Sequence, residues 1–240
     1  MGLPQLQNDV PKYEMTVPST KEVVKYRPFL VKEQKVLLVA FESKDSKQIL
    51  NSMLSCLETC VQGIDVNNLA TFDVDYMFTQ VRSKSVGETT QLLHPCEECN
   101  EENEVKIDLQ TIDIKTNDNW ETEKNVSITD DIVVELKYPT YQDIISNNIL
   151  GKTDGSVAEV LFESIMSCLY SVKTENENIM VKDEPKEEIE RFINSLTNEQ
   201  LEKITSFVEK MPTLTHTEKY ECKKCKHENT IQLNGLNDFF

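Results

Sequence analysis

The sequence has little glycine, no long apolar segment and a shortage of positive charge. Only 6 of its 240 residues are glycine, and none stands in the pattern of a phosphate-binding loop. No apolar run approaches the roughly 18 residues that a membrane-spanning helix needs. The N-terminus lacks the basic start and apolar core of a signal peptide. We therefore expect a soluble, intracellular protein that does not bind membranes.

Lysine and arginine are outnumbered by acidic residues, 25 against 42, which leaves a net charge of −17. A surface this acidic repels phosphate and argues against nucleic-acid binding. The charge is unevenly placed, because residues 97–135 hold 13 acidic and 3 basic side chains, whereas residues 21–47 hold 7 basic and 4 acidic ones. Such asymmetry can steer a partner, although two solvated faces of opposite sign are the simpler explanation.

Histidine is also scarce, and the sequence offers no catalytic set. All 3 histidines lie near cysteine pairs, so no Ser-His-Asp or Cys-His arrangement suggests itself. Paired carboxylates are too common in so acidic a chain to carry information. We therefore predict that the protein is not an enzyme.

The spacing of apolar residues predicts an α+β chain, mainly helical with short strands. Strand-like blocks are expected in VVKYRPFLV and KVLLVAFES, near the N-terminus, and in EVKIDLQTIDI and IVVELKYP. Helical spacing predicts helices over about 45–63, 72–85, 140–150, 156–174, 185–196 and 197–211, the last begun by a T-x-x-Q capping box. Residues 115–131 are polar and acidic and predict a loop.

The chain has seven cysteines, and we do not expect them to form disulfide bonds, because an intracellular compartment keeps thiols reduced. Cys56 and Cys60 stand four residues apart on a predicted helix, where buried packing is a better explanation than metal binding. Cys168 belongs to the apolar face of another helix. The remaining four form two Cys-x-x-Cys pairs, CEEC at residues 96–99 and CKKC at residues 222–225.

The two pairs lie in related stretches of sequence. A shift of 126 positions superimposes Cys96, Cys99, Glu102 and Asn103 on Cys222, Cys225, Glu228 and Asn229, and the following apolar alternation also coincides. Each stretch therefore predicts a turn, a Cys-x-x-Cys knuckle and a strand. Four thiolates satisfy the tetrahedral preference of Zn²⁺ and leave no open position, as in structural sites. We predict a split zinc ribbon with Cys96, Cys99, Cys222 and Cys225 as ligands of a structural zinc ion; independent redox or packing pairs are the alternative.

The separation of the two pairs sets the predicted organisation, since 122 residues lie between Cys99 and Cys222. The segments are an extended N-terminal arm (1–20), an α+β domain (21–92), a first zinc-ribbon half (93–114), an inserted acidic loop and helical region (115–212) and a second zinc-ribbon half (213–240).

Three stretches resemble the baseplate hub and hub-assembly proteins of T-even-like contractile-tailed bacteriophages. They are KYRPFLVKEQKVLLVAFES (residues 25–43), FDVDYMFTQVRSKSVGE (residues 72–88) and SLTNEQLEKITSFVEKMPTLTH (residues 195–216), each in the same order relative to the cysteine pairs. Gln34 departs from the family pattern, which has an acid there. Residues 110–185 show no family-specific resemblance.

The resemblance implies a protein of the tail baseplate central hub, or a chaperone that helps its subunits assemble. The implied partners are other hub or tail proteins, met in the host cytoplasm during assembly or in the virion tail; a homo-oligomer is a further option. The candidate contact residues are Arg27, Lys32, Glu33, Lys35, Arg82 and Lys84. Ordinary solvated charge, and favourable cations at a helix C-terminus, explain the same residues without a partner.

Two other functions remain to be weighed. A zinc-ribbon regulator that binds nucleic acid or a transcription complex shares the cysteine pattern, although the net charge argues against it. A metal-dependent hydrolase requires an open position on the metal, which four sulfurs do not leave.

Overall fold

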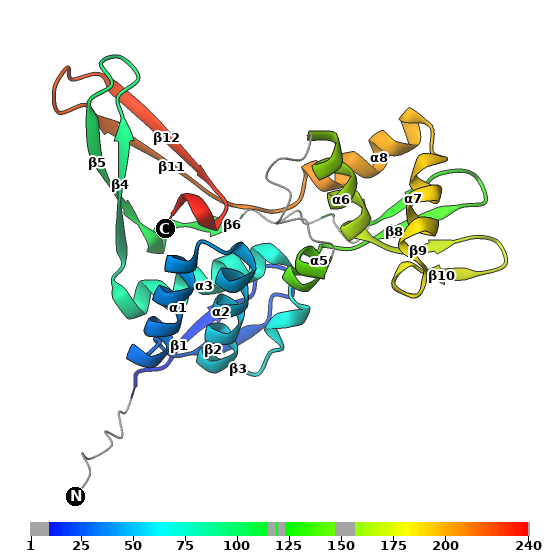
Figure 1. The fold of residues 1–240 in the computed structure, drawn as a ribbon, viewed down its shortest axis with the longest axis horizontal. Coiled ribbons are helices and arrows are strands. Elements are labelled where there is room, and N and C mark those ends of the chain that lie inside the picture. Colours follow the sequence, from blue (N-terminus) through cyan, green and yellow to red (C-terminus); the bar gives the residue numbers. More distant parts are fainter. Residues whose placement is uncertain (1–9, 115–118, 120–122, 147–156, 240) are drawn as a thin grey trace, which may run out of the picture. The chain divides into compact units, whose positions relative to one another are not determined.

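The computed structural model describes residues 10–114, 119, 123–146 and 157–239 (Figure 1). The chain forms two compact units. The first contains residues 1–66, 72–114 and 213–240, and the second contains residues 67–71 and 115–212. The α+β class is confirmed, and helices hold more of the described residues than strands do. No helix in the described part of the chain is long and apolar enough to cross a membrane.

The first unit begins with a small antiparallel sheet and three helices. The strands, in the order β1-β2-β3, are β1 (Tyr13–Thr16), β2 (Val23–Tyr26) and β3 (Val61–Gln62). The helices are α1 (Val31–Ser43), α2 (Ser46–Cys60) and α3 (Thr71–Val86). The side chain of Asp45 caps α2, whose buried face includes Leu50, Met53, Leu54 and Leu57, as helical spacing predicts.

The prediction of a strand in KVLLVAFES is wrong, because these residues belong to α1. Its apolar run has no clear period, so periodicity alone does not distinguish a strand from a helix. The carboxylate of Glu33 accepts a hydrogen bond from the backbone N–H of Leu30, which satisfies a donor at the start of the helix. Lysine, glutamate, glutamine, leucine and alanine within α1 are also good helix formers.

Two long hairpins complete the first unit. β4 (Thr89–Pro95) pairs antiparallel with β5 (Glu102–Asp108), and β11 (Leu214–Glu221) pairs antiparallel with β12 (Glu228–Asn234). In β5 and β12 alternate residues are buried, including Val105 and Ile107 in one hairpin and Ile231 and Leu233 in the other. The sequence predicted this alternation in both halves, and the apolar face of each hairpin contributes to the core.

A short strand closes the base of the hairpins. β6 (Asp113–Ile114) pairs with β11, and Ile114 is the direct partner of Leu214. Both side chains are buried. The chain therefore leaves the first unit after Ile114 and returns to it just before Leu214, so the two crossing points are paired.

The second unit is a four-stranded antiparallel sheet with helices. Its strands, in the order β10-β9-β8-β7, are β7 (Asn125–Ser127), β8 (Val133–Leu136), β9 (Leu169–Lys173) and β10 (Asn178–Met180). Its helices are α5 (Tyr141–Ser146), α6 (Val157–Cys168), α7 (Lys186–Asn194) and α8 (Asn198–Glu209). Within the described ranges, short 3-10 turns occupy Val66–Asn68, Leu109–Thr111, Val181–Asp183 and Leu236–Asp238.

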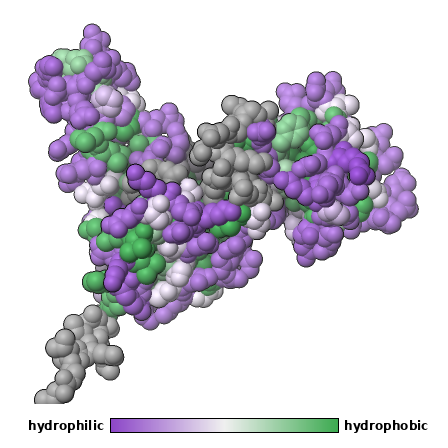
Figure 2. All heavy atoms as spheres, in the orientation of Figure 1, coloured by the Kyte–Doolittle hydropathy of each residue, from purple (hydrophilic) through white to green (hydrophobic). Residues whose placement is uncertain are grey.

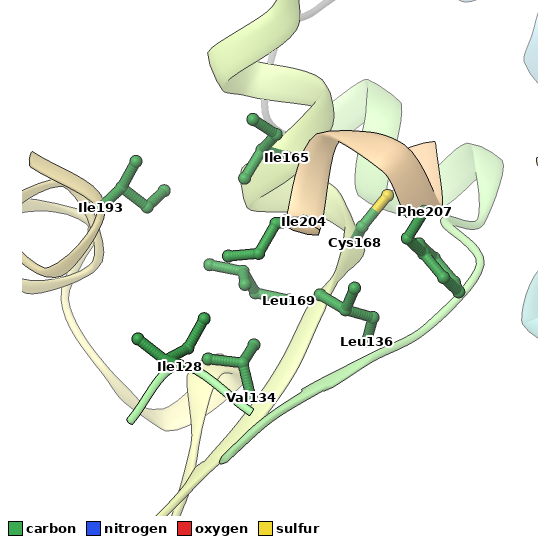
Figure 3. Packing of buried hydrophobic residues seen from close by; sticks show 9 residues of the cluster. All are labelled: Ile128, Val134, Leu136, Ile165, Cys168, Leu169, Ile193, Ile204 and Phe207. Atoms are coloured by element: carbon green, nitrogen blue, oxygen red, sulfur yellow. The ribbon is translucent and has the colours of Figure 1, made fainter. Parts of the chain in front are cut away.

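The core of the second unit lies where α6, α7 and α8 meet the sheet (Figure 3). Ile165 and Cys168 of α6, Ile204 of α8 and Leu136 of β8 are almost fully buried there. Burial raises the pKa of the Cys168 thiol to about 12, so this cysteine is an inert core residue, as predicted.

Two predictions in this region need correction, and one is confirmed. The helix expected over 156–174 ends at Cys168, and Leu169–Lys173 form β9, because β8 offers an edge that pairs with them. The expected loop at 115–131 contains strand β7 within its described part. The capping box of α8 is confirmed, since the backbone N–H of Thr197 donates to Gln200 and the backbone N–H of Gln200 donates to Thr197.

Candidate metal centre

The four cysteines of the two Cys-x-x-Cys pairs meet at the tips of the two hairpins. Their Sγ atoms all lie within 4.8 Å of one another. The Cys96 sulfur is 3.6 Å from that of Cys225, and the Cys99 sulfur is 3.7 Å from that of Cys222, so both contacts join different hairpins. The structure thus brings together all four residues that the sequence predicted as ligands, across 122 intervening residues.

The two knuckles have the same backbone conformation. In the first, the backbone N–H of Asn100 donates to the carbonyl of Cys96, and that of Cys96 donates to the carbonyl of Glu101. In the second, the N–H of Lys226 donates to Cys222, and that of Cys222 donates to His227. Asn100 and Lys226 are both left-handed, with φ of 55° and 63°. The 126-residue shift relates both sets of contacts, so the hairpins are structural repeats.

One asparagine on each hairpin contacts the knuckle of the other hairpin. Asn103 of β5 accepts a hydrogen bond from the backbone N–H of Lys223, at 2.9 Å, and its Nδ2 lies 3.7 Å from the Cys222 sulfur. Asn229 of β12 accepts from the backbone N–H of Glu97 at 3.0 Å. Both asparagines are buried. The sequence reasoning did not name them as site residues, although they coincide under the same shift as the cysteines.

Backbone N–H groups favour thiolates at the first cysteine of each knuckle. The pKa of Cys222 is lowered to about 6, chiefly because the backbone N–H groups of Cys225 and Lys224 outweigh desolvation. Desolvation raises the pKa of Cys96, but the backbone N–H groups of Cys99 and Glu98 bring it below its ordinary value. The backbone of His227 lowers the pKa of Cys225, yet desolvation and three neighbouring sulfurs raise it to about 12. Four thiolates this close would repel one another, and a bound cation would offset that repulsion.

Two of the histidines near the cysteines, His94 and His216, have other contacts. His94 Nδ1 lies 2.8 Å from the Tyr220 hydroxyl, which also contacts the carbonyl of Pro95, so this pair joins β4 to β11. His216 lies 3.2 Å from the Glu218 carboxylate. Within the described chain, the only close group of three or more metal-ligating side chains is the four cysteines.

The lysines of the second knuckle are matched by acids. Lys223 and Lys224 both lie within 3.5 Å of the Glu101 carboxylate on the first hairpin, and Lys226 lies 3.0 Å from Glu221. The two lysines beside it lower the pKa of Glu101. The pairs with Glu101 join the two hairpins at their exposed edge, whereas Lys226–Glu221 lies within the second hairpin, and each pair contributes little on its own.

The predicted contact residues at the start of α1 divide into two kinds. Arg27 and Glu33 form an internal ion pair at 2.9 Å, and the Glu33 side chain is only 6% exposed. Lys32 and Lys35 are exposed, with Lys32 lying 3.4 Å from Glu33. Arg27 and Glu33 fix the chain where it enters α1, whereas Lys32 and Lys35 are accessible to a partner.

The two cations predicted at the end of α3 also differ. Lys84 forms an ion pair with Glu88 at 2.6 Å and lies over the ring of Tyr13. Arg82 is half-buried, and burial lowers the pKa of its guanidinium. Arg82 lines a groove between α1 and α3.

Comparison with known proteins gives one match. Residues 10–240 match the family described as T4 bacteriophage base plate protein. The search of curated proteins and the search of solved structures found no match. The matched range covers both cysteine pairs, the N-terminal sheet and helices and the whole second unit. The chain belongs to the family of T4 bacteriophage base plate proteins.

Proposed function

We propose that the chain is a non-enzymatic structural or assembly protein of the central hub of the tail baseplate, stabilised by a structural zinc ion. The observation that carries this proposal is the convergence of four cysteine sulfurs from two hairpins in a base plate protein. The family supports a role among other baseplate proteins, either in the virion tail or in the host cytoplasm during assembly.

The sulfur positions fit zinc. Four sulfurs bound at about 2.3 Å around a tetrahedral ion lie about 3.8 Å from one another. Two Sγ–Sγ distances are 3.6 and 3.7 Å, and none of the others exceeds 4.8 Å. Cys96, Cys99, Cys222 and Cys225 would hold the ion, and zinc bound by four thiolates supplies stability and no open position for a substrate. The buried asparagines fit the role of partners that orient the ligating sulfurs.

We also propose that residues 93–114 and 213–240 are two halves of one zinc ribbon and that residues 115–212 are an insertion between them. The direct pairing of Ile114 with Leu214 supports this organisation. The same pairing bears on what the proposed metal would hold together. The insertion is closed at the base of the hairpins by β6 and β11, whereas the cysteines lie at their far ends, beyond strands of seven residues that span roughly 23 Å.

Co-expression tests the assembly role. The full chain is produced together with each other baseplate protein of the same phage, and stable complexes are recovered through a tag on the chain. We expect at least one hub protein to co-purify in fixed stoichiometry. Absence of a complex with every baseplate protein would contradict the proposal.

A nucleic-acid-binding zinc ribbon is the alternative function. The three lysines of the second knuckle are the feature that favours it, but all three lie beside carboxylates, and the net charge is −17. A mobility shift on DNA at physiological ionic strength that weakens with added salt would support this alternative. We expect no shift.

A further inference from the structure

The contacts between the two hairpin tips come in matched pairs. The backbone N–H of Lys223 donates to Asn103, and the backbone N–H of Glu97 donates to Asn229. A shift of 126 positions relates the two donors to each other and the two asparagines to each other, so the second hydrogen bond repeats the first with the hairpins exchanged. The two sulfur contacts between the hairpins, at 3.6 and 3.7 Å, repeat in the same way. Such an exchange is the property of a two-fold interface, in which the same patch serves both partners.

An approximate two-fold interface allows a wrong pairing. Each hairpin carries two cysteines and one buried asparagine at equivalent positions, so the first hairpins of two chains can supply four sulfurs to one metal. The opportunity arises during synthesis, because the first hairpin (residues 89–108) is complete before the second (residues 214–234) is made. The pairing of β6 with β11 also waits for the later segment. Correct pairing therefore needs a feature that differs between the hairpins.

The knuckles differ in charge. The first has glutamates at positions 97 and 98, and the second has lysines at the equivalent positions 223 and 224. The ammonium groups of these two lysines lie 3.5 and 3.4 Å from the Glu101 carboxylate of the other hairpin. Figure 2 shows mainly hydrophilic residues around these tips, which Figure 1 draws at the far ends of β4, β5, β11 and β12. Opposite charges therefore meet when unlike hairpins pair.

Like hairpins would bring like charges together. If two first hairpins paired through this interface, Glu97 and Glu98 of one chain would lie where the lysines lie, beside Glu101 of the other chain. The two-fold relation would repeat this contact, so three carboxylates would gather on each side of the metal. Two second hairpins would place the lysines beside His227, the equivalent of Glu101, and would lose both ion pairs. A single exposed ion pair stabilises little, but facing like charges select against a wrong partner.

We propose that Glu101, Lys223 and Lys224 are specificity-determining residues of the metal centre. They make a first hairpin pair with a second hairpin, so that the metal closes a ribbon within one chain and does not cross-link two chains. This inference rests on the proposed structural metal and adds the residues that select which hairpins the metal joins. All three act through their charge, since none of them is a proposed ligand.

Refolding of the full chain at high concentration with one equivalent of zinc tests the selection, with native mass spectrometry as the readout. Glu101→Lys repels the lysines of the second knuckle and attracts Glu97 and Glu98 of another chain. We expect a zinc-dependent dimer that a chelator dissociates, and a zinc affinity lowered by about tenfold. Glu102→Lys makes the same charge change at the neighbouring exposed acid and should form no more of this dimer than the unmodified chain.

A compensating variant separates charge selection from a merely structural role. Lys223→Glu combined with Lys224→Glu should also lower zinc affinity by about tenfold, because both would face Glu101. Adding Glu101→Lys to this pair restores opposite charges and should bring the affinity, measured by competition with a coloured chelator, back to that of the unmodified chain. Lack of rescue, or equal dimer formation by Glu101→Lys and Glu102→Lys, would overturn the inference while the metal centre stands. An unmodified chain that binds no zinc would overturn both.

Discussion

Asn103 and Asn229 hold the two knuckles together through single side chains. Each is buried, and each accepts a hydrogen bond from a backbone N–H of the opposite knuckle. A group that orients a metal ligand typically changes metal affinity by about 10–100-fold when it is removed. We therefore expect Asn103→Ala and Asn229→Ala each to lower zinc affinity by roughly this factor, measured by competition with a coloured chelator.

Asn178→Ala is the matched control for these two variants, because Asn178 is an exposed asparagine in the second unit. Its zinc affinity should equal that of the unmodified chain. Equal affinities for all three variants would show that the asparagines do not support the metal centre.

Glu33 predicts a pH dependence of stability. Burial raises its pKa, but the hydrogen bonds from Arg27 and from the backbone N–H of Leu30 lower it more, so the folded pKa lies below the ordinary value. A carboxylate whose pKa is lower in the folded than in the unfolded state stabilises the fold at pH values above its unfolded pKa of about 4.3. That stabilisation is lost as the pH falls through the folded pKa. Glu33→Gln should cost about 1.5–3 kcal/mol at pH 7 and flatten the loss of stability in acid.

Urea unfolding between pH 3 and pH 7 measures this effect. Glu42→Gln is the control, because Glu42 is an exposed acid on the same helix. The account would be wrong if the two variants had the same stability at pH 7 and the same acid dependence.

Helix α1 contains two adjacent leucines in opposite environments, one buried and one exposed. Substituting each of them tests which face of the helix packs against the core. Leu37 is 5% exposed and Leu38 is 56% exposed. Leu37→Ala should cost about 2–5 kcal/mol of unfolding free energy, because it leaves a cavity in the core. Leu38→Ala should change it by no more than about 0.5 kcal/mol. Urea denaturation of the isolated chain measures both, and a large loss for Leu38→Ala would show that the face is already covered.

Sequence patterns predicted the helices and strands that have a clear period. The alternation in β5 and β12 and the spacing in α2 and α3 agree with the structure. The strand expected in KVLLVAFES was wrong because its apolar residues are nearly continuous, and part of that apolarity faces outward. The end of α6 was misplaced because apolar residues of β9 continue the helical spacing, whereas pairing with β8 decides their conformation. The partner-contact residues remain predictions.

At the scale of the whole molecule, we expect the two units to respond differently to removal of the proposed metal. The hairpins are joined at their tips by the cysteines, whereas the second unit has its own core of Ile165, Ile204 and Leu136. Chelation should raise hydrogen exchange in the hairpins, at residues 89–108 and 214–234, and leave α6 and β8 protected. Exchange measured by mass spectrometry tests this expectation. Simultaneous loss of protection in both units would contradict it.

The meeting of the four cysteines could be predicted from the sequence because two short patterns repeat with the same internal spacing. The sequence did not predict that Ile114 and Leu214 pair at the base, because a two-residue strand has no period to detect. The pairing of β6 with β11 closes the insertion at the base of the hairpins without a metal. The proposed metal would therefore join only the tips of the two hairpins.

The metal content of the full chain tests the central proposal most directly. Native mass spectrometry and elemental analysis are applied to the chain purified without chelators, to Cys225→Ser and to Cys168→Ala, which removes a core cysteine outside the cluster. We predict one zinc ion per chain in the unmodified protein and in Cys168→Ala, and none in Cys225→Ser. A metal-free unmodified chain, or a Cys225→Ser variant that retains a full equivalent of zinc, would contradict it.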